Sequence, residues 1–449
     1  MLFSSNVFLF VFLPCILAIY YLAPRRLRTP VLLVFSLFFY GWGEPVYLFL
    51  MIGDILLNYI CGRWICFDRS NGKSGKCPLI IGIVLNLSLL GFFKYANFLT
   101  GNLLPAIPLP IGISFYIFQS MSYIIDVYRN DAPVQKNVVT FGTYVTLFPQ
   151  LIAGPIVRYA DVAHMLQYRK ESVRQFSSGI ILFLIGLSKK VLLANPMGNL
   201  WNLLQMQDGT LCAWAGLFAY TLQIYFDFSG YSDMAIGLGR MFGFEFLKNF
   251  DYPYISSSIT EFWRRWHISL STWFKEYVYI PLGGNRKGAK RQILNLLIVW
   301  TLTGLWHGAS WNFVMWGFYY ALLLIAEKTF LLKALNKQPK ILQHLYTMLA
   351  VMLGWALFYF EELPALGRFL TKLFLPASSV SGIHLLLGHL PLMIAAVLAA
   401  TPLLSNKAEK FANLPFFRYG KILAISALLL LCIAALASQS YNPFIYFRF

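Results

Sequence analysis

Two histidines stand beside tryptophans in an otherwise apolar chain, and both are candidates for proton transfer. His307 follows Trp306, and His267 follows Trp266 forty residues earlier. An ionisable side chain at membrane depth is costly, so it marks a functional site by default. Histidine is also the side chain whose ordinary pKa, about 6.5, lets it accept and return a proton near neutral pH. We therefore predict that His307 is a catalytic general base and that His267 is a second catalytic residue.

The neighbours of His307 favour a reactive site over a packing role. Gly308 lets another backbone approach closely, and we predict that Trp306, Trp311 and Asn312 bind substrate beside it. A positioned histidine base contributes roughly 10²–10⁴-fold to a rate. That is enough to activate a hydroxyl against a thioester, which is already reactive. The alternative is a histidine that is hydrogen-bonded in the bundle for packing.

His267 leaves three roles open. It can position an acyl group, act as a second base, or only hydrogen-bond a backbone carbonyl. The preceding Arg264 and Arg265 are predicted to bind the phosphates of a donor, although the basic character of a cytosolic membrane face explains them equally well.

The remaining polar groups give no separate chemistry. Asp227 and Asp233 fit ion pairs or hydrogen bonds to loop amides better than ion ligation, and Lys189 and Lys190 end an apolar run and fit snorkelling side chains. The cysteines lack a zinc-type spacing, so we expect reduced thiols and no bound metal or cofactor. Motifs of serine hydrolases, P-loop NTPases and dinucleotide-binding proteins are missing from the sequence.

Long apolar runs must position these residues. The 449 residues are 58% hydrophobic and 12% charged, whereas soluble proteins carry about 25% charged residues. We predict an all-α, polytopic transmembrane protein that forms a single domain over residues 1–449. The net charge of +18 lies mostly in short loops, which indicates a basic cytosolic face and contacts with lipid headgroups rather than with nucleic acid.

About twelve spans follow from the apolar runs and the alternating charge. The basic loops place both termini on the outer side of a cytoplasmic membrane. The expected spans are residues 7–22, 30–42, 45–61, 78–93, 110–127, 176–194, 211–226, 293–306, 311–326, 341–360, 390–404 and 422–437.

Two other segments are expected to depart from simple spans. Residues 138–155 are apolar but interrupted by glycine and proline, with basic residues on both sides, so we predict a re-entrant segment around a cavity. Residues 239–291 form a long basic stretch on the cytosolic side. Within it, Ser258 and Glu261 form a capping-box pattern that predicts an amphipathic helix extending through Trp273 and Phe274.

The chain resembles the membrane-bound O-acyltransferase family, most closely the bacterial branch of alginate and peptidoglycan O-acetyltransferases. The matching stretches are PIGISFY at 110–116, LFPQLIAGP at 147–155, YFDFSGYSD at 225–233, FWRRWH at 262–267, PLGGNR at 281–286 and WHG at 306–308. The resemblance implies that His307 is the principal catalytic histidine and His267 the second. It also implies a tunnel through the membrane, acetyl-CoA as the acyl donor on the cytosolic side, and an extracytoplasmic partner of the SGNH-hydrolase type that acetylates a polysaccharide.

The last six residues resemble a terminal motif of such transferases in which a tyrosine is proposed to carry the acyl group. This motif makes Tyr446 a candidate catalytic residue. The alternative is an aromatic anchor at the membrane interface. Two other functions stay open for the whole chain: D-alanyl transfer to teichoic acid, and transport or flipping of a substrate across the membrane.

Overall fold

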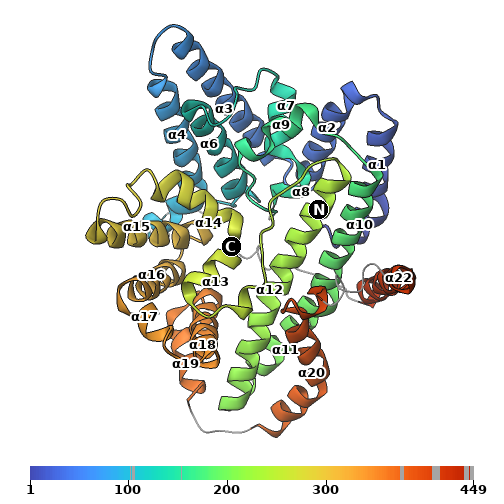
Figure 1. Ribbon diagram of the computed structural model, residues 1–449, viewed down its shortest axis with the longest axis vertical. Helices are drawn as coiled ribbons and strands as arrows, with labels where there is room; N and C mark the ends of the chain where they lie inside the picture. The colour runs from blue at the N-terminus through green and yellow to red at the C-terminus, as the bar shows by residue number, and fades with distance from the viewer. Residues whose placement is uncertain are drawn as a thin grey trace. The chain divides into compact units, whose positions relative to one another are not determined.

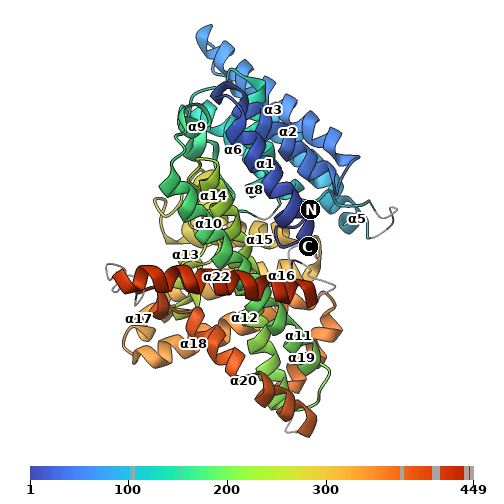
Figure 2. The same cartoon turned by 90° about the vertical axis from the view of Figure 1, so that its right-hand side faces the viewer.

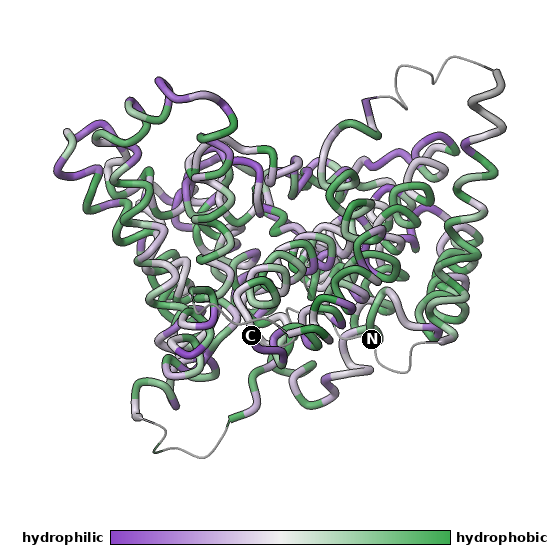
Figure 3. Tube along the Cα trace, turned by 90° about the horizontal axis from the view of Figure 1, so that it is seen from below, coloured by the Kyte–Doolittle hydropathy of each residue, from purple (hydrophilic) through white to green (hydrophobic). Residues whose placement is uncertain are grey.

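The protein consists of helices that form on its apolar runs. The structure is a computed structural model that describes residues 1–101, 103, 107–152, 154–374, 379–406, 415–438 and 444. No strand occurs in these ranges. Among the described residues, six helical stretches are long and apolar enough to cross a membrane, and Phe8–Leu22 is a shorter apolar helix. Figure 3 shows the same division along the tube, with most hydrophobic residues in helices and many hydrophilic residues in the connections. The all-α, membrane-type fold is confirmed, whereas the count of about twelve spans stays a prediction.

The chain divides into two compact units. The first comprises Met1–Phe183 and Tyr231–Leu247, and the second comprises Leu184–Gly230 and Lys248–Phe449. The helix α10 (Val173–Ser188) and the 32-residue helix α12 (Thr210–Met241) contribute to both. Each unit is described below on its own.

In the first unit, three helices enclose a buried polar cluster. These helices, α3 (Tyr47–Ser70), α4 (Lys76–Leu90) and α6 (Ile113–Arg129), pack against one another. Ser120 Oγ donates to Asp54 Oδ2 at 2.6 Å, and Asn58 Nδ2 donates to Asp54 Oδ1 at 2.9 Å. Asn86 Nδ2 donates to Asn58 Oδ1 at 2.8 Å. Side chains on α3 and α6 thus satisfy a carboxyl group that would otherwise destabilise an apolar interior, and Asn86 on α4 supports one of them.

The other helices of this unit frame an irregular segment. They are α1 (Leu13–Leu22), α2 (Arg28–Gly41), α7 (Val138–Thr146), α8 (Phe148–Leu151) and α9 (Tyr159–Tyr168). The chain leaves helical geometry at Leu147, where φ is −49° and ψ is 108°. Residues 141–152 are all buried. The predicted break inside protein is confirmed, and its re-entrant course through a membrane stays a prediction.

The second unit is built around a hairpin of α15 (Ala289–His307) and α16 (Trp311–Ala326), with α18 (Lys340–Tyr359) packed on α16 (Figure 1). The hairpin helices cross closely at Gly304 and Gly317. A Cβ on Gly304 would overlap the carbonyl oxygen of Phe313, and one on Gly317 would overlap that of Trp300. This close crossing fixes the position of His307, three residues after Gly304.

Shorter helices complete this unit. They are the π-helical segment η4 (Lys189–Ala194), α11 (Asn195–Leu204), α13 (Ile259–Arg265), α14 (Ile268–Phe274), α17 (Leu332–Leu335) and α19 (Leu363–Lys372). The late helices α20 (Val380–Ala399) and α22 (Pro415–Ser438) pack against α11 and η4, respectively (Figure 2). The helix α20 begins ten residues before the span predicted at 390–404, and it continues through Pro391.

An ion pair buried in the second unit corrects one prediction. Lys190 Nζ lies 2.5 Å from Asp227 Oδ1, and the two side chains are 5% and 1% exposed. Lys190 therefore does not snorkel to an interface. Asp227 has the pairing role that was favoured over ion ligation. The six cysteines are all free, as expected.

Candidate functional site

The helix α13 begins at a well-defined N-terminal cap. Ser258 Oγ accepts a hydrogen bond from the Glu261 N–H at 3.0 Å, which confirms the predicted start of the helix. The carboxylate of Glu327, on the segment after α16, accepts from the N–H groups of Ile259 at 2.7 Å and Thr260 at 2.8 Å. Helix N-termini stabilise negative charge, so Glu327 joins the end of α16 to the start of α13.

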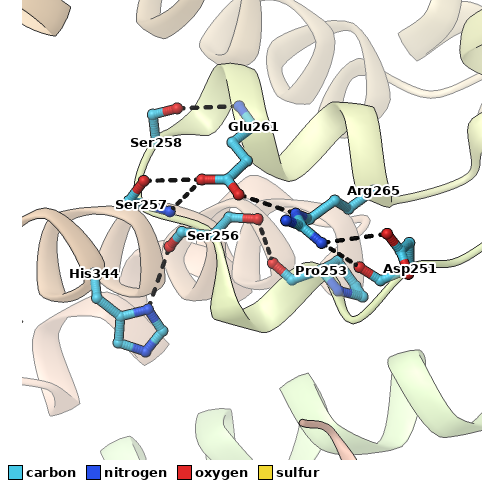
Figure 4. A network of polar contacts seen from close by, with 8 residues as sticks. All are labelled: Asp251, Pro253, Ser256, Ser257, Ser258, Glu261, Arg265 and His344. Carbon is cyan, nitrogen blue, oxygen red and sulfur yellow. Dashed lines mark hydrogen bonds and ion pairs between the residues drawn. The ribbon is translucent and has the colours of Figure 1, made fainter. Parts of the chain in front are cut away.

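A second set of polar contacts holds the same helix (Figure 4). Arg265 Nε donates to Glu261 Oε1 at 3.0 Å, and Arg265 also contacts the Asp251 carboxylate at 3.3 Å. Ser257 donates to Glu261 through both its N–H and its hydroxyl. His344 Nδ1 lies 3.2 Å from the carbonyl oxygen of Ser256. These contacts fix α13 on the preceding loop.

His267 lies where α13 gives way to α14. Its φ of 45° and ψ of 54° are left-handed values that non-glycine residues seldom adopt. A single helix through Phe274 was expected, so that prediction is wrong: the chain turns at Trp266 and His267. The side chain is 1% exposed, and burial lowers the pKa of His267 from 6.5 to about 3. The imidazole is therefore neutral near pH 7.

His307 ends α15 inside an aromatic enclosure. Its ring centroid lies 5.0 Å from Trp306, 5.0 Å from Trp316 and 5.3 Å from Phe358, and the residue is 7% exposed. A Cβ at Gly308 would overlap the ring of Phe313. The close neighbour of Gly308 is thus a side-chain ring and not the backbone that was predicted, and the contact depends on space rather than on an unusual φ.

Trp306 lies close to both histidines. Its ring centroid is 6.1 Å from that of His267 and 5.0 Å from that of His307. It is 3% exposed. Both imidazoles therefore pack near the same buried indole ring, although the two histidines are forty residues apart in the sequence.

A cavity of about 850 Å³ opens beside His267. Its walls come from α13, α14, α15 and the loop from Ile280 to Lys287, all in the second unit. Pockets for small ligands typically measure about 300–1,000 Å³. Five of the residues in its lining are cationic and none is acidic; the five are Arg264, Lys275, Arg286, Lys287 and Lys328. The cavity thus combines a positive lining with a buried neutral imidazole, which suits an anionic ligand that carries a reactive group.

Comparisons with known proteins identify the family of this chain. The model of MBOAT, the membrane-bound O-acyltransferase family, matches residues 127–360. A probable alginate O-acetylase of Pseudomonas putida is 40% identical over 100% of both chains. The chain belongs to the membrane-bound O-acyltransferase family. A peptidoglycan O-acetyltransferase of Helicobacter pylori is 35% identical over 81% of this chain and 78% of that protein. A teichoic acid D-alanyltransferase of Bacillus subtilis is 27% identical over 49% and 59%, respectively.

Membership makes this protein an acyltransferase and, together with its apolar helices, a multi-pass membrane protein. The family match includes α13, α14, the cavity loop and the α15–α16 hairpin. Both histidines and every cationic residue of the cavity therefore lie inside the matched part of the chain.

The substrate-binding residues predicted in this acyltransferase lie in different surroundings. Arg264 lines the cavity, whereas Arg265 is engaged by Glu261 and Asp251. Trp311 is 64% exposed at the first position of α16. Asn312 is fully buried, and its Nδ2 donates to the carbonyl oxygen of Phe358 at 3.4 Å. Tyr446 lies outside the described residues.

Several site residues escaped the sequence analysis. Lys275, Arg286, Lys287 and Lys328 line the cavity, and Asn249 contacts His267. The stretch PLGGNR at 281–286 carried a signal, because paired glycines before basic residues indicate a turn that presents charge. Asn249 had no such signal, since its role depends on a contact made through folding.

Proposed function

We propose that this acyltransferase takes acetyl groups from cytosolic acetyl-CoA and passes them across the cytoplasmic membrane for O-acetylation of an extracytoplasmic polysaccharide. The names of two relatives support this substrate class. At 40% identity over the full chain, the Pseudomonas putida relative is named for alginate, and the Helicobacter pylori relative is named for peptidoglycan. Alginate, peptidoglycan or a similar polymer is thus the proposed acceptor.

The cationic cavity beside His267 is the observation that carries the proposal. Acetyl-CoA is an anion with several phosphate groups and a thioester at one end. Lysine and arginine side chains are the usual ligands of phosphate. The cavity offers five of them along its lining and a neutral imidazole at His267. The phosphates bind among the cations, and the thioester is directed towards the histidines.

The reaction needs a base and a path for one proton. The acceptor hydroxyl oxygen attacks the thioester carbonyl carbon, an ester bond forms and the carbon–sulfur bond breaks. His307 takes the hydroxyl proton, and that proton then neutralises the departing CoA thiolate. His267 lines the donor cavity, and Trp306 lies close to both histidines. General base catalysis of this kind accelerates a reaction by about 10²–10⁴-fold.

The membrane gives the reaction its direction. Acetyl-CoA carries phosphates and cannot dissolve in the hydrocarbon core, so a passage through the protein must bring the acetyl group to the outer side. The basic loops support a cytosolic donor side, about twelve spans and two outward-facing termini. An extracytoplasmic partner of the SGNH-hydrolase type then places the acetyl group on the polymer.

Charge removal in the cavity tests the donor. Replacing Arg264 or Lys287 with alanine should raise the KM for acetyl-CoA about 5–20-fold, because losing one charged hydrogen bond costs about 1.5–3 kcal/mol before solvent screening. Release of CoA thiol by purified protein in lipid nanodiscs measures this change. Lys290→Ala is the matched control, since Lys290 is exposed and does not line the cavity.

The same assay separates the alternative functions. A D-alanyl transferase fed by a carrier protein would release no CoA, and a transporter would leave acetyl-CoA intact. Either outcome with wild-type protein would reject the proposed donor. Equal KM values for Arg264→Ala, Lys287→Ala and Lys290→Ala would reject the cavity as the donor site.

Tyr446 is proposed to carry the acetyl group to the outer side. Its phenol has an ordinary pKa near 10, so an aryl acetate remains activated for a second transfer. Tyr446→Phe keeps an aromatic anchor and removes the hydroxyl. We expect this variant to lose acetylation of the polysaccharide in cells while its amount in the membrane is unchanged. Full acetylation in Tyr446→Phe would reject the relay and leave the donor proposal standing.

A further inference from the structure

The surroundings of Asn249 indicate which atom donates in its hydrogen bond with His267. Asn249 lies in the loop after α12 and is 1% exposed. Its Oδ1 accepts from the Ser269 N–H at 3.1 Å and from Ser269 Oγ at 2.9 Å. The same oxygen lies 3.2 Å from His267 Nδ1. One amide oxygen thus serves three groups across the turn between α13 and α14.

The backbone donor identifies that atom as oxygen. Asparagine oxygen and nitrogen are hard to tell apart by shape, and their assignment depends on the hydrogen-bond network. A backbone N–H can only donate, so the side-chain atom facing Ser269 N must accept. An amide oxygen cannot donate. A hydrogen bond between this oxygen and His267 Nδ1 therefore requires the proton on Nδ1, whereas the Ser269 hydroxyl, 3.5 Å from the same nitrogen, is the longer contact.

This assignment leaves the other imidazole nitrogen as an acceptor. His267 Nε2 is buried and has no hydrogen-bond partner in the part of the chain that the structure describes. The residue lines the cationic cavity. The ring of Phe228 packs against the imidazole with centroids 4.7 Å apart and planes at 87°. Ring packing and the Asn249 contact together oppose reorientation of the side chain.

The backbone of Asn249 stabilises the same turn. The Ile268 N–H donates to the Asn249 carbonyl oxygen at 3.0 Å, directly after the left-handed residue His267. Residues in such conformations persist only where their surroundings impose them. Asn249 is thus linked both to the unusual backbone of His267 and to its side chain.

We infer that Asn249 is a positioning residue that keeps His267 protonated on Nδ1, so that Nε2 presents its lone pair to the donor cavity. This inference rests on the proposed function, because it assigns the Nε2 lone pair a use in acyl transfer. Of the three roles left open by the sequence, it assigns His267 that of a second base. Asn249 itself touches no reacting atom.

Nitrogen NMR of the imidazole tests the tautomer without any measure of activity. The chain has six histidines, so ¹⁵N-histidine labelling of protein in nanodiscs gives a small set of signals, and His267→Gln identifies those of His267. We expect wild-type His267 to show a pyrrole-type Nδ1 and a pyridine-type Nε2 at pH 7. A wild-type spectrum with the proton on Nε2 would overturn the inference, whatever the variants do.

Matched variants test the role of Asn249. Asn249→Ala should give a mixture of the two tautomers, whereas Asn249→Asp, which retains an acceptor, should restore the Nδ1-protonated form. Ser269→Ala removes one donor to the same oxygen and also the hydroxyl 3.5 Å from His267 Nδ1. It keeps the Asn249 contact, so its spectrum should match wild type if Asn249 sets the tautomer. An unchanged His267 spectrum in folded Asn249→Ala would overturn the inference.

Kinetics connect the tautomer to turnover. In Asn249→Ala, kcat should fall about 10-fold or more, within the roughly 10²–10⁴-fold that a positioned base supplies, with a KM for acetyl-CoA within about threefold of wild type. A rise in KM with unchanged kcat would overturn the link to turnover. If wild-type protein does not react with acetyl-CoA, the proposed function fails, and the NMR result still decides the tautomer.

Discussion

His267 combines three features that seldom occur together in a residue held only for packing. Its backbone is left-handed, its Nδ1 faces a buried amide oxygen, and the residue lines a cationic cavity. His307 is enclosed differently, by the rings of Trp306, Trp316 and Phe358. The two histidines therefore differ in surroundings, which fits two distinct roles in one transfer reaction.

The low pKa of His267 predicts a pH-dependent stability. Above about pH 6.5 the imidazole is neutral in both the folded and the unfolded protein. Below that pH the unfolded chain binds a proton that the folded protein excludes until about pH 3, so the stability falls as the pH falls. From pH 8 to pH 5 the loss should be about 2 kcal/mol, at about 1.4 kcal/mol per pH unit below 6.5.

Thermal denaturation in detergent measures this effect. The difference between wild type and a His267 variant isolates this contribution from those of other groups that titrate between pH 5 and pH 8. His267→Gln should flatten the pH dependence of the melting temperature, whereas His164→Gln, at an exposed position, should leave it as in wild type. Parallel curves for wild type and His267→Gln would contradict the burial of a neutral imidazole.

At the scale of elements, the α15–α16 hairpin sets the position of His307. Gly304→Ala should destabilise the protein by about 1–3 kcal/mol, the usual cost of forcing extra volume into packed structure. The added methyl group would press on the Phe313 carbonyl and shift the end of α15. Acetyl transfer should therefore fall more than the amount of folded protein.

Gly53→Ala supplies the control for this change. Gly53 lies inside α3, and a Cβ there meets no atom within 4 Å. Melting temperatures and CoA release are compared for the two variants at equal protein concentration. Equal behaviour of Gly304→Ala and Gly53→Ala would show that the close crossing does not position the site.

Hydropathy and capping patterns predicted most of these elements. The range 311–326 coincides with α16, and Ser258 caps α13 as its spacing to Glu261 indicated. The break between α13 and α14 at His267 was not predicted. Contacts with Asn249, in the loop after α12, stabilise it, and such contacts between separate segments form only in the folded chain. The different surroundings of Arg264 and Arg265 were also beyond the sequence, since neighbouring positions on a short helix cannot be assigned to a face without knowing what packs there.

At the scale of the whole molecule, the positions of the positive charges cannot be predicted from composition alone. The net charge of +18 reflects many exposed loops. Five cations nevertheless gather in one cavity next to a catalytic candidate, within residues 260–328. In the first unit, by contrast, a buried carboxylate is satisfied by serine and asparagine. The chain thus concentrates its cavity chemistry in the second unit.

Family membership and this cavity together lead to a single claim about the molecule. A donor bound among cations delivers its acyl group past two histidines to an acceptor on the other side of a membrane. The matched region, residues 127–360, includes the whole of this machinery except Tyr446. The claim therefore stands or falls with His307, the base proposed for the reaction.

The most direct measurement is the acetyl ester content of the exported polysaccharide in cells whose only copy of the protein carries His307→Ala, normalised to the amount of protein in the membrane. We predict that acetylation falls to the level of cells without the protein, while His384→Ala, at an exposed position, retains the wild-type level. Wild-type acetylation in His307→Ala cells would contradict the account.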